Sequence, residues 1–228
     1  MKIRNLVFCQ ILTTLLVIGL ISCTSTGAAM KNLGTVPLRS LSEKTLILEI
    51  GMAEWDRAIL PLVDAGIYNA GLNGIANDFN IQQAESLASI HSQLSLFYGD
   101  LYQAEVVNAQ FPFEITGYIT DSTSRNFFDN LDSAKIQKIM DIGAANDAKY
   151  VLAIVGQMST LGVSAFGING NNRLYFNMAL FDASGNIAAK GVAYSSLVNC
   201  ASKDINTFIS LFTETTPYLQ NMLRGIGN

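Results

Sequence analysis

The sequence has one histidine and three cysteines in 228 residues, which restricts the metal and thiol chemistry open to it. No second histidine and no cysteine cluster stands near His91 to complete a zinc site. His91 falls beside Leu87 and Leu94 in a run with helical spacing, so we expect it to pack at the boundary of the core. We therefore predict no metal site, no cofactor and no histidine-based catalysis.

Positive charge is also scarce, with 14 Lys and Arg residues against 18 Asp and Glu. No Lys or Arg occurs from Ala58 to Ser124, whereas seven acidic residues do. This balance argues against a nucleic-acid partner, because binding to nucleic acid relies on basic patches. Surface helices normally mix both signs. The acidic stretch therefore faces a cationic partner, is covered by protein, or is a chance feature of a chain of low charge.

Motifs for nucleophilic and phosphate chemistry are incomplete. The segment 162–167 surrounds Ser164, but it is one residue longer than a G-x-S-x-G elbow and precedes a strand-like run. The segment 167–172 lacks the GK[ST] of a phosphate-binding loop. Carboxylates remain as possible acid–base pairs, and only convergence in space would identify them. The candidates are Glu105, Glu114, Asp121, Asp129 and Asp132.

The first 22 residues have the composition of an export signal. Lys2 and Arg4 precede a short apolar run that ends just before Cys23, and this run has neither the length nor the flanks of a membrane-spanning helix. Residues 20–23, Leu-Ile-Ser-Cys, resemble the lipobox of bacterial lipoproteins. The resemblance implies that residues 1–22 are a lipoprotein signal peptide and that Cys23 is acylated. The alternative is an uncleaved signal anchor with an incidental cysteine.

Cleavage before Cys23 would leave 12 positive and 18 negative side chains. Cys9 would leave with the signal, so Cys200 would have no partner for an intrachain disulfide, and we expect it to be a small buried side chain. Thr24 rather than aspartate follows Cys23, and resemblance to enteric sorting implies the outer membrane. The expected localisation is an exported protein held to the bacterial cell envelope through a lipid on Cys23.

One folded domain is expected after the signal peptide. Residues 23–43 have no periodic pattern and are predicted to be a flexible tether, and residues 44–228 have a length that suits a single α/β domain. The first predicted elements are a strand over 45–50, a helical pattern over 52–101 with a stop at Gly99, and strands over 103–108 and 113–119. A helix capped by Asp132 or Ser133 follows and ends before Asn146. The closing helix is predicted over 204–223, with a kink or break at Pro217.

Three strand-like runs, 149–158, 173–182 and 187–195, are joined by short Gly/Asn-rich links and predict an antiparallel meander. The second link places Gly185 where a type I turn with a bulge requires positive φ. In the first run we place Val151, Ala153 and Val155 on one face and Leu152 and Ile154 on the other. Both faces are apolar, so helices should cover both. The predicted fold class is α/β (α+β): a mixed sheet with a C-terminal three-stranded antiparallel meander, flanked by helices on both faces.

The meander and the segment before it carry a resemblance to known proteins. Residues 144–156 (AANDAKYVLAIVG), 174–182 (LYFNMALFD) and 185–188 (GNIA) resemble a pattern of envelope lipoproteins related to LpoB, CsgG and the TolB N-terminal domain. That pattern is a helix, Gly-Ala-Asp-Tyr-Val-Leu-hydrophobic-Gly, a strand and a Leu-x-Asp-x-x-Gly hairpin. Where it has Gly-Ala-Asp-Tyr, this chain has Asp147-Ala148-Lys149-Tyr150. The resemblance implies an envelope assembly or regulatory role and carries over no catalytic residue.

An asparagine stripe is the candidate contact face. Asn69, Asn73 and Asn77 recur at i+4 spacing and would align along one helix, which Gly71 and Gly74 weaken by roughly 1 kcal/mol each relative to alanine. Such glycines favour close backbone approach. We predict that this face packs tightly against another element; the alternative is an exposed stripe that can serve a partner.

These observations favour a lipid-anchored cell-envelope protein with a non-enzymatic binding, assembly or regulatory role. Its expected partners are the membrane, through Cys23, and another envelope protein. Two alternatives stay open. A hydrolase of envelope polymers with a carboxylate pair would need an acidic cleft, and a solute-binding lipoprotein would need an apolar pocket.

Overall fold

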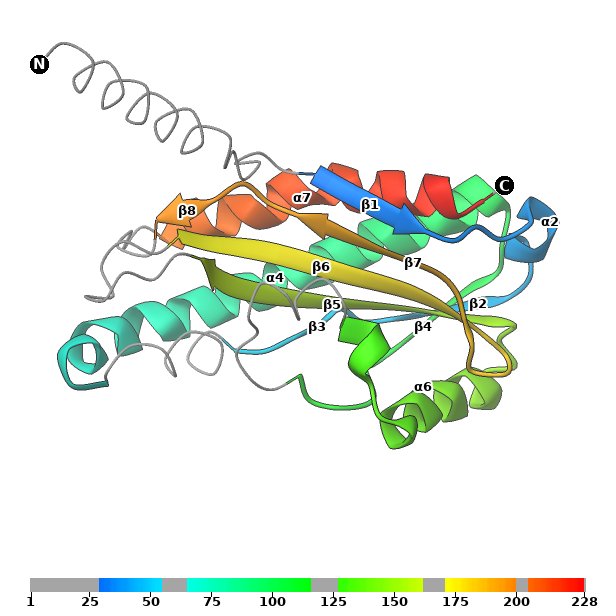
Figure 1. Ribbon diagram of the computed structural model, residues 1–228, viewed down its shortest axis with the longest axis horizontal. Helices are drawn as coiled ribbons and strands as arrows, with labels where there is room; N and C mark the ends of the chain where they lie inside the picture. Colours follow the sequence, from blue (N-terminus) through cyan, green and yellow to red (C-terminus); the bar gives the residue numbers. More distant parts are fainter. Residues whose placement is uncertain (1–28, 55–64, 116–126, 162–170, 200–204, 228) are drawn as a thin grey trace, which may run out of the picture.

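The computed structural model describes residues 29–54, 65–115, 127–161, 171–199 and 205–227. A single twisted sheet forms the middle layer, with two long helices behind it and one shorter helix on the other side (Figure 1). The helices are α2 (Leu38–Leu41), α4 (Ala65–Tyr102), α6 (Ser133–Ala145) and α7 (Ile205–Ile226), with a 3-10 turn η2 (Phe127–Asn130). No helix within the described ranges combines the length and the apolar character needed to cross a bilayer.

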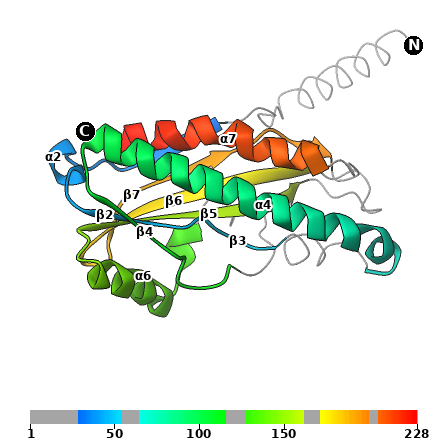
Figure 2. The ribbon, with the colours of Figure 1, turned by 180° about the vertical axis from the view of Figure 1, so that it is seen from behind.

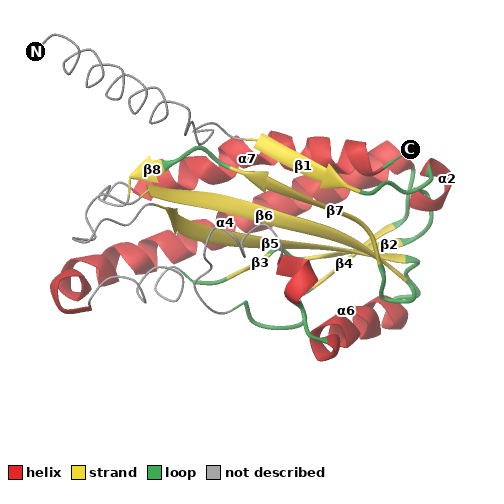
Figure 3. Cartoon of the chain, in the orientation of Figure 1, coloured by secondary structure: helices red, strands yellow, loops and turns green. Residues whose placement is uncertain are grey.

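The sheet has eight strands in the order β1-β7-β6-β5-β2-β4, with β3 paired to β5 and β8 paired to β6. Strand β2 runs parallel to both β5 and β4, whereas β5, β6, β7 and β1 are successively antiparallel (Figure 3). The sheet is therefore mixed, as predicted. The strands are β1 (Ala29–Leu33), β2 (Thr45–Leu48), β3 (Gly51–Met52), β4 (Val106–Ala109), β5 (Tyr150–Leu161), β6 (Asn171–Asp182), β7 (Ile187–Tyr194) and β8 (Val198–Asn199).

The predicted meander is confirmed in β5, β6 and β7. Strands β5 and β6 pair without interruption from Tyr150 opposite Asp182 to Leu161 opposite Asn171. The two faces of β5 join two separate cores, and Leu152 and Ile154 belong to the core beneath α4 and α7. Val151, Ala153 and Val155 belong to the other core, with Ile139 of α6. Continuous burial on both faces explains why this strand is apolar throughout.

Helices α4 and α7 cover one face of the sheet side by side, as the reverse view shows (Figure 2). Phe79 of α4 meets Phe208 and Phe212 of α7 with ring centroids 6.2 and 6.4 Å apart. Farther along α4, Leu94 and Tyr98 are completely buried. The larger of the two cores lies between the sheet and these two helices. Its apolar contacts hold the C-terminal half of α4 against the sheet.

Helix α6 covers the other face. It begins where the sequence predicts, with Asp132 as N-cap accepting a hydrogen bond from the backbone N–H of Lys135 (2.8 Å). Ile139 is fully buried, and Gly143 lets the helix approach β5 closely, because a β-carbon built there would lie 2.6 Å from Cγ2 of Val151. The helix ends at Ala145, before Asn146, also as predicted.

The β6–β7 hairpin has the predicted turn. Gly185 has φ +81°, and its N–H donates to the carbonyl of Asp182 (2.9 Å). The Asp182 carboxylate accepts from the N–H groups of Ser184 (2.8 Å) and Asn186 (3.0 Å). Partial burial by itself raises the pKa of this carboxyl, but the hydrogen bonds from Asn186 and Ser184 outweigh it, so the pKa is lowered.

The predicted tether, residues 23–43, differs from the structure over its second half. Residues 29–33 form the edge strand β1, in which Ala29 pairs with Tyr194. Val36 is buried, and its N–H donates to the carbonyl of Ile226 (2.6 Å), so the chain here is tied to the end of α7. The folded domain thus begins before residue 44. The sequence signal is weak because an edge strand pairs with one other strand only, here β7, and so needs less apolar sequence than a central strand.

Two boundary predictions were wrong, and of the kink or break expected at Pro217 the break does not occur. The predicted stop at Gly99 is not the end of α4, which continues to Tyr102. The predicted strand over 113–119 is absent from its described part, because residues 113–115 lie in no strand. Pro217 does not break α7, which continues through it to Ile226. Proline removes only one N–H bond, and the packing of Leu219 and Met222 holds the helix together beyond it.

Candidate functional site

The cation-free stretch of the sequence folds largely into α4 and β4. The described part of α4 exposes Asp78, Glu85 and Asp100, and Glu105 just before β4 pairs with Lys44 at 3.2 Å. A surface helix of this length normally carries both signs of charge. The outer side of α4 is therefore an acidic surface that a cationic partner would complement.

The same helix exposes large apolar side chains. Leu96 is 71% exposed, Ile81 54% and Leu101 39%. Leu38 of α2 is the one other large hydrophobic side chain exposed in the described ranges. A concentration of such side chains on one element is unusual, and exposed apolar groups among polar ones are a mark of interaction surfaces.

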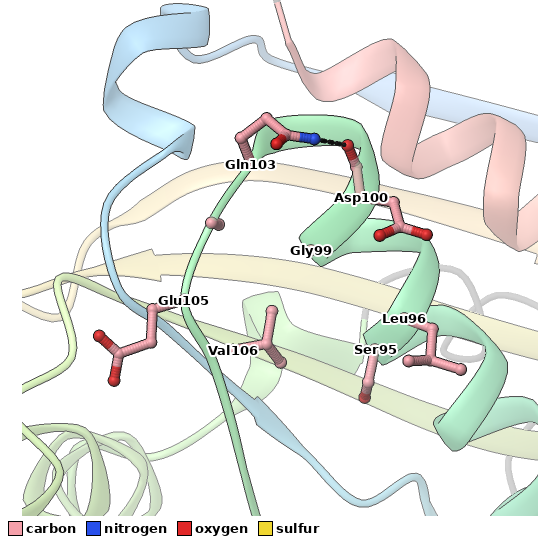
Figure 4. Close-up of a pocket in the computed structure, with 8 residues that line it drawn as sticks. Ser95, Leu96, Gly99, Asp100, Gln103, Glu105 and Val106 are labelled. Atoms are coloured by element: carbon pink, nitrogen blue, oxygen red, sulfur yellow. Dashed lines mark hydrogen bonds between the residues drawn. The ribbon is translucent and has the colours of Figure 1, made fainter.

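A depression of about 430 Å³ lies where α4 ends and β4 begins (Figure 4). Val106 points from the strand toward α4, from which Ser95 and Leu96 project, whereas Glu105 points to the other side of the strand (Figure 4). Ser95 donates a hydrogen bond to the side-chain oxygen of Asn108 (2.8 Å), which ties α4 to β4 here. The residues that line the depression are Ser95, Leu96, Gly99, Asp100, Gln103, Ala104, Glu105 and Val106.

Gln103 sets the shape of this depression. It has φ 51°, a left-handed conformation that costs a side-chain-bearing residue free energy and that glycine would adopt more easily. Its side-chain amide donates to the carbonyl of Asp100 (2.7 Å), and the N–H of Ala104 donates to the carbonyl of Gly99 (3.2 Å). These bonds turn the chain from helix to strand at once. Strained residues of this kind cluster at functional sites.

A second depression of about 510 Å³ lies between α4 and α7. Pro217, one of its lining residues, has no N–H to offer the carbonyl of Thr213 one turn earlier. Six of the ten lining residues carry a hydroxyl or an amide group. Its residues are Glu85, Ser86, Ser89, Ile90, Gln93, Phe212, Thr213, Thr216, Pro217 and Gln220.

The structure brings the predicted asparagine stripe onto α4, the helix of both depressions. Asn69, Asn73 and Gly74 fall in its first turns, but their side chains lie outside the described part of the structure. Asn77 is exposed. Whether this face packs closely or serves a partner stays a prediction. Cys23, like Cys200 and Ser164, also lies outside the described residues.

The predicted carboxylates are engaged with different lysines. Asp129 holds Lys190 with both oxygens (2.6 and 2.7 Å), and Asp132 caps α6. Glu105 pairs with Lys44, as noted above. Glu114 is exposed, and Asp121 lies outside the described ranges. Three of the five candidates therefore hold elements of the fold together.

Other titratable groups in the described ranges also have structural roles. His91 is half-buried, with Nε2 3.5 Å from the carbonyl of Ile47, a position at the edge of the core. Burial raises the pKa of Tyr98, opposed in part by its hydrogen bond with Thr45, and burial likewise raises the pKa of Tyr102. Their hydroxyls therefore stay protonated. Within the described residues, no group of three or more His, Cys, Asp or Glu side chains is placed to hold a metal ion.

Sequence reasoning missed the groove at the end of α4. The missing positive charge from 58 to 124 did point to this part of the chain. However, the exposure of Leu96 depends on how α4 rotates onto the sheet, and the left-handed Gln103 has no sequence signal, since glutamine is not a preferred residue there.

No protein-family profile and no curated protein matches the chain. Among solved structures, a PelC dodecamer from Paraburkholderia phytofirmans is 12% identical over 82% of this chain and 94% of its own, with a TM-score of 0.37. A protein described as a neuraminyllactose-binding hemagglutinin homolog from Helicobacter pylori is 12% identical over 83% of this chain and 86% of its own, with a TM-score of 0.37. Protein CT253 from Chlamydia trachomatis is 11% identical over 80% of this chain and 98% of its own, with a TM-score of 0.30. Similarity at this level does not identify a shared function.

Proposed function

We propose that this chain is an exported lipoprotein, anchored through Cys23 to the cell envelope, that binds another envelope protein through the α4 side of its domain. The observation that carries the binding role is the outer surface of α4. It exposes Leu96 and Ile81 together with carboxylates, and no Lys or Arg belongs to the helix. Its apolar side chains supply contact area, and its charge selects a basic partner.

The anchor rests on sequence alone. The apolar run before Cys23 and the Leu-Ile-Ser-Cys lipobox support cleavage and acylation, and a single lipid-modified cysteine with its acyl chains holds a domain at a membrane surface. Metabolic labelling with radioactive palmitate should label the wild type and not Cys23→Ala, which should leave the membrane fraction. Mass spectrometry that finds residues 1–22 still attached to the mature protein would contradict the anchor.

Binding is tested separately by site-specific photocrosslinking in cells. A photoreactive amino acid placed at Leu96 should give a discrete crosslinked product in the membrane fraction. The matched control is Lys138, which is exposed on α6 on the opposite face of the sheet. Equal crosslinking from both positions, or none from Leu96, would show that the α4 side is an ordinary solvated surface.

The hydrolase alternative receives less support from the geometry. Asp129, Asp132 and Glu105 are each engaged with a lysine or a helix N-terminus, and their partners differ. A glycosidase-type mechanism instead needs two carboxylates that flank one substrate bond. The binding hypothesis accounts for the exposed apolar and acidic side chains of α4, which the hydrolase hypothesis does not explain.

A further inference from the structure

Strand β4 ends the described sheet, and no described strand lies beyond it. Its pairing with β2 uses alternate residues: the N–H of Thr45 donates to the carbonyl of Glu105 (2.9 Å), and the N–H of Glu49 donates to that of Ala109 (2.8 Å). Because backbone groups alternate along a strand, Val106 and Asn108 direct their N–H and C=O groups away from β2. No strand in the described ranges pairs with this side.

Within the described residues this four-residue edge strand carries no lysine, no proline and no bulge. Natural proteins guard edge strands with lysine, proline, a bulge or a covering element, because unpaired strands recruit other chains. The sequence of β4 is Val-Val-Asn-Ala, and its ladder with β2 runs without a bulge. Strand β1, at the opposite edge, carries an exposed Lys31. A strand edge without lysine, proline or bulge suits strand addition by another segment.

The groove beside β4 indicates what kind of segment would be added. Leu96, exposed on α4, is part of its lining and would pack against an apolar side chain (Figure 4). Asp100 contributes a carboxylate, and no ion pair of Asp100 occurs within the described residues. The last turn of α4 contains no basic residue, so the helix itself supplies no cation to offset the partial negative charge of its C-terminus.

We propose that the outer edge of β4 is a docking site for an extended segment of another envelope protein, which adds to the sheet as a further strand and places a Lys or Arg side chain beside Asp100. This inference rests on the proposed binding function and specifies its partner. The backbone of the added segment satisfies Val106 and Asn108, and its side chains meet Leu96 and Asp100.

A second copy of this chain fits the edge less well. Pairing β4 with β4 of another copy would bring residues 103–115 into the groove, and this segment contains no Lys or Arg. Asp100 and the helix C-terminus would then stay uncompensated. The charge of the groove therefore favours a different, basic partner.

The test compares two substitutions at one exposed position. Asn108→Pro removes the outward N–H, whereas Asn108→Ala keeps it, and both lose the hydrogen bond from Ser95. The probes are seven-residue peptides of alternating threonine and valine with lysine, serine or glutamate at the centre. Binding to the mature protein is followed by NMR through the amide signals of Val106 and Asn108, with the Val106 amide as the reporter in the proline variant.

We expect the lysine peptide to bind best, with the glutamate peptide at least about fivefold weaker. Asn108→Pro should weaken the lysine peptide by about tenfold or more, and Asn108→Ala should stay within about threefold of the wild type. Failure of the lysine peptide to shift the β4 amides at millimolar concentration, or equal binding to the proline and alanine variants, overturns the proposal.

A second variant keeps the test decisive if Asn108→Pro does not fold. Leu96→Lys places a positive charge in the groove and should weaken the lysine peptide, whereas Ile81→Lys, at a similarly exposed position farther along α4, should not. Equal effects of the two substitutions would overturn the proposal.

Sedimentation that shows a dimer lost in Asn108→Pro would identify a second copy as the occupant instead. If the photocrosslink from Leu96 persists in Asn108→Pro, the proposed binding function stands. Strand addition at β4 is then excluded as the way the partner binds.

Discussion

Close packing of α6 on the sheet can be tested at Gly143. A methyl group there would lie 2.6 Å from Cγ2 of Val151, whereas carbon atoms pack at about 3.5 Å or more, so one side would have to move by roughly 1 Å. Val151 is buried near the start of β5, and its branched side chain has little rotamer freedom. Overpacking of this kind costs about 1–3 kcal/mol, and the higher helix propensity of alanine returns about 1 kcal/mol.

We therefore expect Gly143→Ala to lower the free energy of unfolding by about 1 kcal/mol, measured by urea denaturation with circular dichroism on the mature protein. Val151→Ala removes the obstructing methyl, so the double variant should be more stable than the sum of the two single effects by about 1–2 kcal/mol. Ala144→Gly, at an exposed position, controls for propensity alone. A neutral Gly143→Ala, or strict additivity in the double variant, would refute direct contact between Gly143 and Val151.

Three further predictions concern the two chain reversals that frame this packing. Gly185→Val should lower the free energy of unfolding by about 1 kcal/mol or more, because φ is +81° there, and Ser184→Ala in the same turn should have a much smaller effect in the same urea titration. Asp147 has φ 52° just after α6, so Asp147→Gly should raise the thermal midpoint through a gain of about 0.5–1 kcal/mol; a lower midpoint would contradict this reading. The lowered pKa of Asp182 means that its ionised form contributes stability above pH about 4, and this contribution disappears as the pH falls through the folded-state value. The difference in stability between wild type and Asp182→Asn should therefore shrink from pH 6 to pH 3, and a constant difference would exclude the ionised carboxylate as its cause.

The C-terminal half of the fold could be predicted because local and global signals agree there. Asp132 caps α6 by its own side chain, and Gly185 is required by the geometry of a two-strand turn. The alternate burial of β5 follows from an uninterrupted apolar run, which only a strand covered on both faces can satisfy. Each of these features depends on residues that are close in sequence.

The N-terminal part could not be predicted in the same way, because distant residues decide it. Residues 29–33 become a strand only because β7 offers them an open edge. The helix α4 passes Gly99 because Tyr102 is buried and donates to the carbonyl of Leu223 on α7. Helix propensity favours a stop at glycine, but tertiary packing overrides it.

The candidate site shows the same division. The missing cations from 58 to 124 identified the right part of the chain, since α4 and β4 both fall within it. The groove itself depends on Gln103, which is strained, and on Asn108, whose outward N–H follows from pairing with β2. Neither the strain nor the pairing has a signature in the residue types.

The positions of β1 and β4 give the proposed anchor and the proposed docking edge a definite relation. Cys23 precedes Ala29 by six residues, a span of at most about 20 Å, so a lipid on Cys23 would hold the β1 edge close to the membrane surface. Strand β4 is the last of six strands from β1 in the sheet order, about 24 Å away at roughly 4.8 Å per strand. The docking edge would then face away from the edge that is tied to the bilayer. A segment of another envelope protein could reach β4 without competing with the anchor for space, and the acidic side of α4 would be presented to it.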